Sequence, residues 1–235
     1  MPYRKLDPAR IIDTAKILSA RVAERFPDSG LSKIAAEMVN LARDTEKTAA
    51  ELEQPIWWLR IVIASIIAAG ATVFIFVGTV LPFERISTNA FESVEGIEAS
   101  LNTILLAGIG FLALVRYEER IKRKRVFRAL HGLRSLIHVI DMHQLTKDPA
   151  VLTAPLKPTP SSPTRTMSAP ELSRYLDYCS EMLSITGKVA ALFAQSVNDE
   201  VVIDAVNDIE ELATNLSRKI WQKIMILDER ALHAR

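Results

Sequence analysis

The chain has 235 residues, and 29 basic against 28 acidic side chains leave it a formal net charge of +1. Such a balance provides no extended cationic surface for a polyanion, so we expect no nucleic-acid partner. The single cysteine, Cys179, excludes an intramolecular disulfide and suits a reducing compartment. Hydrophobic residues make up 49% of the chain and are concentrated in its middle. The helical spacing of its apolar residues predicts an all-α protein.

Residues 1–55 are predicted to form a hairpin of two amphipathic helices. Asp7 and Pro8 are a typical helix start, an N-cap residue followed by a proline in the first turn. Residues 27–30 read as a tight turn, and Pro55 is expected to end the second helix. That helix carries apolar residues or threonine at alternating spacings of three and four: Leu31, Ile34, Met38, Leu41, Thr45, Thr48 and Leu52.

Residues 56–115 are predicted to form a transmembrane helical hairpin with spans at about 57–81 and 97–115. The first span contains 21 consecutive uncharged residues, about 30 Å of helix and enough to cross the hydrocarbon core. Trp57 and Trp58 precede this run, at the depth where aromatic rings favour the headgroup region. The second uncharged run has 17 residues, at the short end of the range. The alternative is a pair of core helices in a soluble bundle.

The charges on either side of these spans predict their orientation. The loop at 82–96 and the residues next to it contain one cation, Arg85, whereas residues 116–128 contain seven Lys or Arg and two Glu. Because an excess of Lys and Arg marks the cytoplasmic side, both termini are expected in the cytoplasm of a bacterial inner-membrane protein. Four acidic side chains would then lie outside, where they could attract cations: Glu84, Glu92, Glu95 and Glu98.

Within the spans, small residues such as Gly70, Gly108 and Gly110 would let helix backbones approach closely. Neither span has an acidic residue or histidine at its centre. This pattern argues against a proton relay or a charged transport site.

Residues 116–147 are predicted to continue the second span as a basic and then amphipathic cytoplasmic helix. Clustered cations just beyond a span attract anionic lipid headgroups, and the expected contacts are Arg120, Lys122, Arg123, Lys124 and Arg125. The same cluster is also the ordinary signal that stops translocation.

A polar stripe follows on this helix, formed by His131, Arg134, His138 and Asp141 at spacings of 3-4-3. We interpret it as a hydrogen-bonded network that joins the helix to a partner helix or protomer. His138 and Asp141 could also chelate a metal, but two further ligands would have to come from elsewhere. They could act as acid and base, yet no nucleophile is positioned by the sequence. The prediction therefore assigns no catalytic residue, metal or cofactor.

The run LRSLIHVIDMHQLTKDP, followed later by SRKIWQKIMIL, resembles a family of uncharacterised bacterial two-span inner-membrane proteins. The resemblance implies a bacterial inner membrane and no particular chemistry. The layout of two spans with helical cytoplasmic extensions is also similar to the two-span SLATT effectors. That similarity of architecture implies pore formation in bacterial defence.

Residues 148–169 are predicted to be a linker, because six of the eleven prolines lie between positions 148 and 170. Residues 170–235 are predicted to form a second helical hairpin, capped at its start by Ser168 and Glu171. Its net charge of −4 is opposite to that of the basic cluster, so it could fold back on that cluster.

These observations predict a non-enzymatic membrane scaffold or regulator that oligomerises through its cytoplasmic helices. The alternative is a homo-oligomeric two-span pore with a glutamate-rich outer loop. The expected partners are the lipid bilayer, further copies of the chain and a possible unknown protein.

Overall fold

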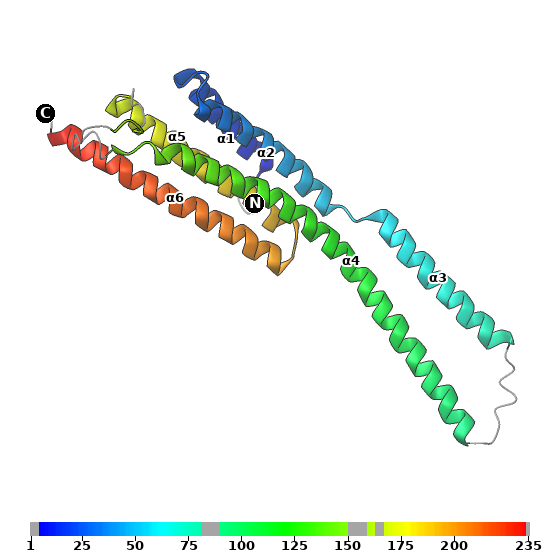
Figure 1. Cartoon of the computed structure of the whole chain (residues 1–235). Coiled ribbons are helices and arrows are strands. Elements are labelled where there is room, and N and C mark those ends of the chain that lie inside the picture. The colour runs from blue at the N-terminus through cyan, green and yellow to red at the C-terminus, as the bar shows by residue number, and fades with distance from the viewer. Residues whose placement is uncertain (1–4, 81–89, 150–158, 163–166, 234–235) are drawn as a thin grey trace. The chain divides into compact units, whose positions relative to one another are not determined.

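The computed structural model describes residues 5–80, 90–149, 159–162 and 167–233 (Figure 1). Within these ranges all regular secondary structure is helical, which confirms the all-α class. The helices are α1 (Pro8–Arg25), α2 (Gly30–Glu53), α3 (Trp57–Val80), α4 (Ala90–Leu145), α5 (Ala169–Ser196) and α6 (Glu200–His233). The chain divides into two units, one of Met1–Glu53 with Arg125–Arg235 and the other of Gln54–Lys124.

Two helix starts predicted from the sequence are confirmed by their hydrogen bonds. The Asp7 carboxylate accepts from the backbone N–H of Ala9 at 3.1 Å, and Pro8 occupies the first turn of α1. At α5, the Glu171 carboxylate accepts from the backbone N–H of Ser168 at 2.8 Å and completes a capping box. Each contact satisfies a backbone donor that the helix itself leaves without a partner.

The helix α4 is longer at its start than the sequence analysis predicted. A loop was expected over 82–96, but residues 90–96 already belong to this helix of 56 residues, and residues 82–89 lie outside the described ranges. The predicted helix through the apolar segment and on into the basic segment is present, because α4 runs on to Leu145 without a break. No proline lies between Pro82 and Pro149 to interrupt it.

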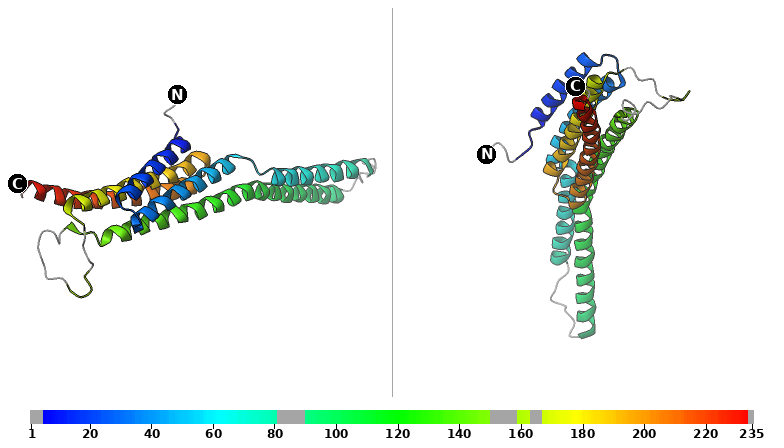
Figure 2. Two further views of the ribbon diagram at one scale, coloured as in Figure 1. Left: turned by 90° about the horizontal axis from the view of Figure 1, so that it is seen from above. Right: turned by 90° about the vertical axis from the view of Figure 1, so that its left-hand side faces the viewer.

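The larger unit is a bundle of α1, α2, the end of α4, α5 and α6 that shares one apolar core. The Ser180 hydroxyl lies 2.6 Å from that of Ser217, and Gly187 packs against Glu210, so α5 and α6 run antiparallel. Figure 2 shows this pair side by side in both views. The predicted core face of α5 is confirmed, because every residue expected on it is buried: Leu172, Leu176, Cys179, Leu183, Thr186, Ala190 and Phe193.

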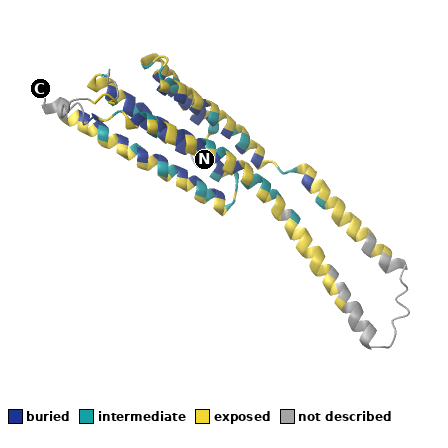
Figure 3. Ribbon diagram, in the orientation of Figure 1, coloured by how far each residue is buried: buried dark blue, intermediate teal, exposed yellow. Residues whose placement is uncertain are grey.

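The helix α3 has a different surface, exposed along nearly all of its described length (Figure 3). Among the described residues, one stretch, Gly30–Thr72, is long and apolar enough to cross a membrane. The apolar part of this stretch lies in α3, which carries no charge after Arg60. Only 6% of the apolar window is buried, whereas the core helix of a soluble protein would be mostly buried. The second predicted span, 97–115, is not among the stretches that pass this test.

Candidate functional site

The structure divides the polar stripe of α4 between the bundle and solvent. His131 and His138 are exposed. An Arg134 nitrogen lies 3.8 Å from an Asp208 carboxylate oxygen on α6, and both side chains are about half exposed or more. The Asp141 carboxylate accepts from the Gln144 amide at 2.6 Å on the same helix. Of the four residues of the stripe, Arg134 therefore contacts another helix, whereas Asp141 bonds within α4.

The best-buried polar cluster lies at the end of α4. The Lys223 ammonium of α6 donates to the backbone carbonyl of Gln144 at 3.1 Å and to its side-chain oxygen at 2.5 Å. Gln144 is 3% exposed, and its side-chain amide donates a hydrogen bond to the Asp141 carboxylate. Because the last carbonyls of a helix have no partner within it, a lysine at this position satisfies one of them.

Burial lowers the pKa of Lys223, and the nearby carboxylates Asp148 and Asp141 act against this effect. Cys179 lies close enough to interact with Lys223, and burial raises the pKa of its thiol to about 12. A thiol with such a pKa stays protonated and is a poor nucleophile. The lysine already donates two hydrogen bonds, so the cluster fits a structural cross-link between α4 and α6.

His143 has a packing role that the sequence analysis did not predict. Its Nδ1 donates to the backbone carbonyl of Val139 at 3.0 Å. Its Nε2 lies where a Cβ atom on Gly30 would come within 2.6 Å. The first residue of α2 therefore has to lack a side chain for the imidazole to fit.

The metal hypothesis for His138 and Asp141 receives no support from the described part of the chain. There, no three His, Cys, Asp or Glu side chains lie close enough to hold one ion. The hydrogen bond from Gln144 also occupies one Asp141 oxygen.

A second polar cluster, in the smaller unit, joins the start of α3 to the middle of α4. Glu118 of α4 accepts from the backbone N–H of Ile56 at 3.3 Å, directly before α3. Its carboxylate also lies 3.3 Å from the Lys122 ammonium and 3.8 Å from the Arg60 guanidinium. The Glu118 side chain is 17% exposed. This residue holds the beginning of α3 against α4, and the sequence offered no signal for the contact.

The residues predicted to meet lipid headgroups separate into two groups. Lys122 is turned toward Glu118, whereas Arg120, Lys124 and Arg125 are exposed. Arg123 is half-buried.

Most of the glutamates predicted to lie in the outer loop have side chains that the structure does not describe. Glu84 lies in an undescribed range, and the side chains of Glu92 and Glu95 are not described although their backbone is helical. Glu98 is exposed.

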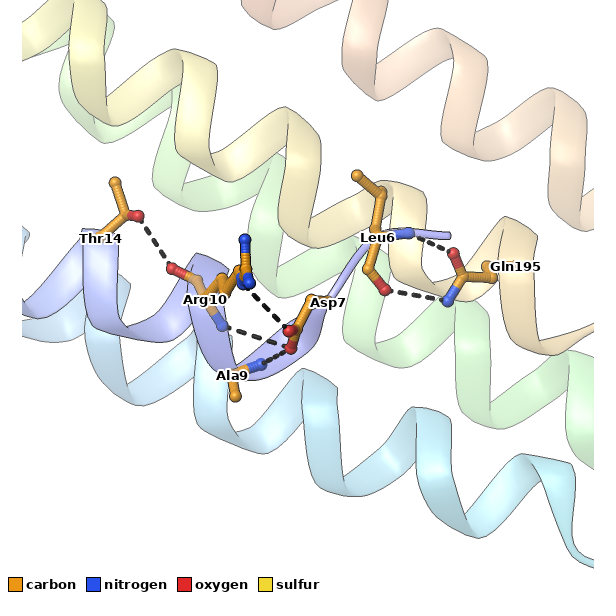
Figure 4. A network of polar contacts seen from close by, with 6 residues as sticks. All are labelled: Leu6, Asp7, Ala9, Arg10, Thr14 and Gln195. Carbon is orange, nitrogen blue, oxygen red and sulfur yellow. Dashed lines mark hydrogen bonds and ion pairs between the residues drawn. The ribbon is translucent and has the colours of Figure 1, made fainter. Parts of the chain in front are cut away.

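The chain before α1 is tied to the end of α5 by one side chain (Figure 4). The Gln195 amide accepts from the Leu6 N–H at 2.8 Å and donates to the Leu6 carbonyl at 3.2 Å. One glutamine thus satisfies both backbone groups of a residue outside a helix, as a neighbouring strand would. Nothing in the sequence pairs these two positions, which are 189 residues apart.

Trp221 of α6 is a large exposed side chain that lies beside α5. It is 52% exposed and lines three shallow grooves of about 510, 270 and 540 Å³. The grooves have mixed polar and apolar walls. Their shape and lining suit contact with another protein surface better than enclosure of a small ligand.

Comparison of the chain with protein-family models, with curated proteins and with solved structures gives no match.

Proposed function

We propose that the protein is a non-enzymatic scaffold or regulator that crosses the bacterial inner membrane twice, through α3 and the apolar part of α4. The observation that carries the proposal is the exposed apolar surface of α3 in a chain whose other unit has a complete buried core. A helix of this kind is stable in water only if another apolar surface or a bilayer covers it.

The apolar part of α4 supports a second crossing. Large apolar side chains there are exposed in the same way as those of α3, among them Leu101, Ile104, Leu105, Ile109 and Leu112. A Cβ atom added to Gly108 or Gly110 would meet nothing within 4 Å, so these glycines do not serve packing within one chain. Their open surfaces are available to lipid or to another protomer.

The bundle supports assembly with a protein partner, with a second copy as the first choice. It exposes large apolar side chains that its own core does not use: Met142 and Leu145 on α4, and Trp221 and Met225 on α6. Methionine and tryptophan are enriched at protein interfaces, and tryptophan is frequent among the residues that contribute most to binding. Among the described buried polar residues, Gln144 and Ser180 bond to α6 and Thr186 bonds to a carbonyl of its own helix. These contacts favour a structural role over catalysis.

Thiol labelling tests the topology. Cys179 is fully buried and its thiol is protonated, so it gives little background. The variant Lys33→Cys on α2 is expected to react with a membrane-impermeant maleimide in inverted vesicles and not in intact spheroplasts. Glu92→Cys is expected to show the reverse. Labelling of both sites from the same side would refute the two-span arrangement.

The mass of the detergent-solubilised complex tests assembly. Light scattering, with the detergent contribution subtracted, is expected to give a small oligomer for the proposed scaffold. A monomer would refute assembly through the bundle. A closed ring of four or more copies would instead favour the pore alternative, because two spans per chain enclose no aqueous path by themselves, and conductance measurements would follow.

A further inference from the structure

The smaller unit brings aromatic and cationic side chains from distant parts of the sequence to one level. Ile56 is bonded to Glu118, so the residues that flank these two positions are at the same height along the helices. Trp57 and Trp58 follow Ile56, and Tyr117 precedes Glu118. All three rings are well exposed, the tryptophans by 68% and 58%. Exposed tryptophan and tyrosine rings at one level are typical of the boundary between hydrocarbon and headgroups.

A row of cations begins at this level. Arg116, Arg120 and Lys124 follow one another at intervals of four on α4, and all three are exposed. At about 100° per residue, successive members are rotated by only about 40°, whereas Glu118 lies about 160° from Arg120 around the helix. The face of α4 that carries the row is therefore opposite to the face that holds α3.

The structure also shows which charges are free to act. Glu118 engages Lys122 and Arg60 on the side of α3. Within the described residues no carboxylate forms an ion pair with Arg116, Arg120 or Lys124. Glu119 is exposed beside the row, about 100° from Arg120, and reduces its net charge by one. With respect to the described residues, the row therefore keeps an excess of positive charge.

We infer that this row binds the phosphate groups of anionic phospholipids in the leaflet at whose depth Trp57, Trp58 and Tyr117 lie. The inference rests on the proposed function, since it requires α3 and the apolar part of α4 to be in the bilayer. It replaces the five-residue contact set expected from the sequence by Arg116, Arg120 and Lys124. Cations held just outside the hydrocarbon attract anionic headgroups, at most roughly fivefold in local lipid concentration for each charge.

Quenching by brominated lipids tests this inference on the full-length chain. The protein has three tryptophans, and replacing all three by Phe together with Tyr117→Trp leaves one reporter on α4. This position is exposed and lies about 100° from Arg116 and about 60° from Arg120 around the helix. The variant is reconstituted into vesicles of phosphatidylcholine with a minor fraction of phosphatidylglycerol. Bromine is placed on the phosphatidylglycerol chains in one preparation and on an equal mole fraction of phosphatidylcholine in the other. Quenching by the brominated anionic lipid is expected to be stronger, by about twofold or more.

Neutralising the row supplies the decisive comparison. The triple variant Arg116→Gln, Arg120→Gln, Lys124→Gln is expected to quench equally with both lipids. A matched triple variant on exposed α2 positions, Lys33→Gln, Arg43→Gln and Lys47→Gln, is expected to keep the preference. High salt should reduce the preference in the parent protein, because the charges are exposed to solvent.

The outcomes separate the two proposals. Equal quenching in the parent protein would overturn the anionic preference and leave the membrane insertion intact. A preference that survives neutralisation of the row would assign the lipid contact to other residues and overturn the inference. Absence of quenching by either lipid would place position 117 of α4 outside the bilayer and overturn the proposed function itself.

Discussion

The carboxylate of Glu118 accepts a hydrogen bond from the backbone N–H of Ile56 across 62 positions of the sequence. The residues before α3 are Gln54, Pro55 and Ile56, so none of the usual N-cap side chains is present there. Glu118 of α4 accepts instead from the N–H of Ile56 itself, the bond that a glutamate of a capping box makes. Its negative charge also suits the positive end of the α3 dipole. This contact defines where the two helices meet at their polar ends.

Removing this acceptor is expected to loosen the base of the hairpin. Glu118→Ala should lower the free energy of unfolding by about 1–3 kcal/mol, because it leaves the Ile56 N–H and two cations without their partner. Glu118→Gln keeps an acceptor oxygen and should cost less. Thermal unfolding in mild detergent gives the order, and the exposed neighbour variant Glu119→Ala is the control. Equal effects of Glu118→Ala and Glu119→Ala would contradict the assigned role.

The Lys223 cross-link is expected to contribute to the stability of the bundle. Lys223→Met should cost about 1–3 kcal/mol, because it leaves the buried side-chain oxygen of Gln144 without a donor. The backbone carbonyl of Gln144 keeps the N–H of Lys147 as a donor. Lys219→Met changes an exposed lysine on the same helix and should have little effect. Chemical unfolding followed by circular dichroism measures the difference. A double variant with Gln144→Leu should recover part of the loss, since both polar partners are then removed.

The contact between His143 and Gly30 predicts a steric rather than a conformational requirement for glycine. Gly30→Ala would place a Cβ atom 2.6 Å from His143 Nε2. Moving the ring away would break its bond to Val139, at a cost of about 1 kcal/mol. Gly187→Ala is the matched control, because its nearest neighbours lie at 3.8 Å or more.

The steric explanation also predicts coupling between the two positions. Adding His143→Ala should remove most of the penalty of Gly30→Ala, so the effects in the double variant are not additive. Purely additive effects would refute the steric explanation.

Cys179 is expected to make the bundle sensitive to alkaline conditions. The pKa of its thiol is raised by burial to about 12 in the folded chain, from 9.0. The unfolded thiol therefore ionises first, and this contribution to stability is complete below pH 9.0 and is lost as the pH rises to about 12. The slope should be about 1.4 kcal/mol per pH unit within that window.

Comparison with Cys179→Ala isolates the effect of the thiol. The lowered pKa of Lys223 acts in the opposite direction, because a depressed pKa of a base makes stability rise with pH below 10.5. Since both proteins contain Lys223, the difference removes its contribution except for the part that comes from its interaction with Cys179. The stability difference between the parent and Cys179→Ala should shrink as the pH rises through the window. A constant difference would show that the thiol remains protonated on unfolding or is not buried.

The Arg134–Asp208 pair is expected to contribute little. The side chains are 48% and 70% exposed and the atoms are 3.8 Å apart, a geometry in which ion pairs contribute about 0–1 kcal/mol. Arg134→Gln should therefore change the unfolding midpoint only marginally, and less so at high salt. A loss comparable to that of Lys223→Met would show that the pair is more strongly coupled than its exposure indicates.

The patterns that repeat along the chain were sufficient to predict most of the fold. Asp7 and Ser168 identified two helix starts, since capping depends on residues within four positions of each other. The apolar face of α5 also followed from spacing, because a core face recurs with the period of the helix. The loop expected at 82–96 extended too far, because α4 already begins at Ala90. Its acidic composition indicates contact with solvent, and an exposed acidic segment can still be helical.

The polar sites were harder to predict, because each joins helices that are far apart in the sequence. Spacing placed His131, Arg134, His138 and Asp141 on one stripe, but it could not show that the histidines face solvent. Lys223 and Glu118 looked like ordinary surface charges. Only their neighbours in space, Gln144 and Ile56, give them structural roles.

Composition and periodicity by themselves determined that the chain is helical, where an uncharged segment long enough for a bilayer lies, and which residues form the core. These properties depend on local spacing, and they can be read along one helix at a time. The tertiary structure decided which polar groups are satisfied and which charges remain free. Lys122 pairs with Glu118, whereas Arg120 is exposed, because a half-buried carboxylate needs partners within reach while an exposed cation does not.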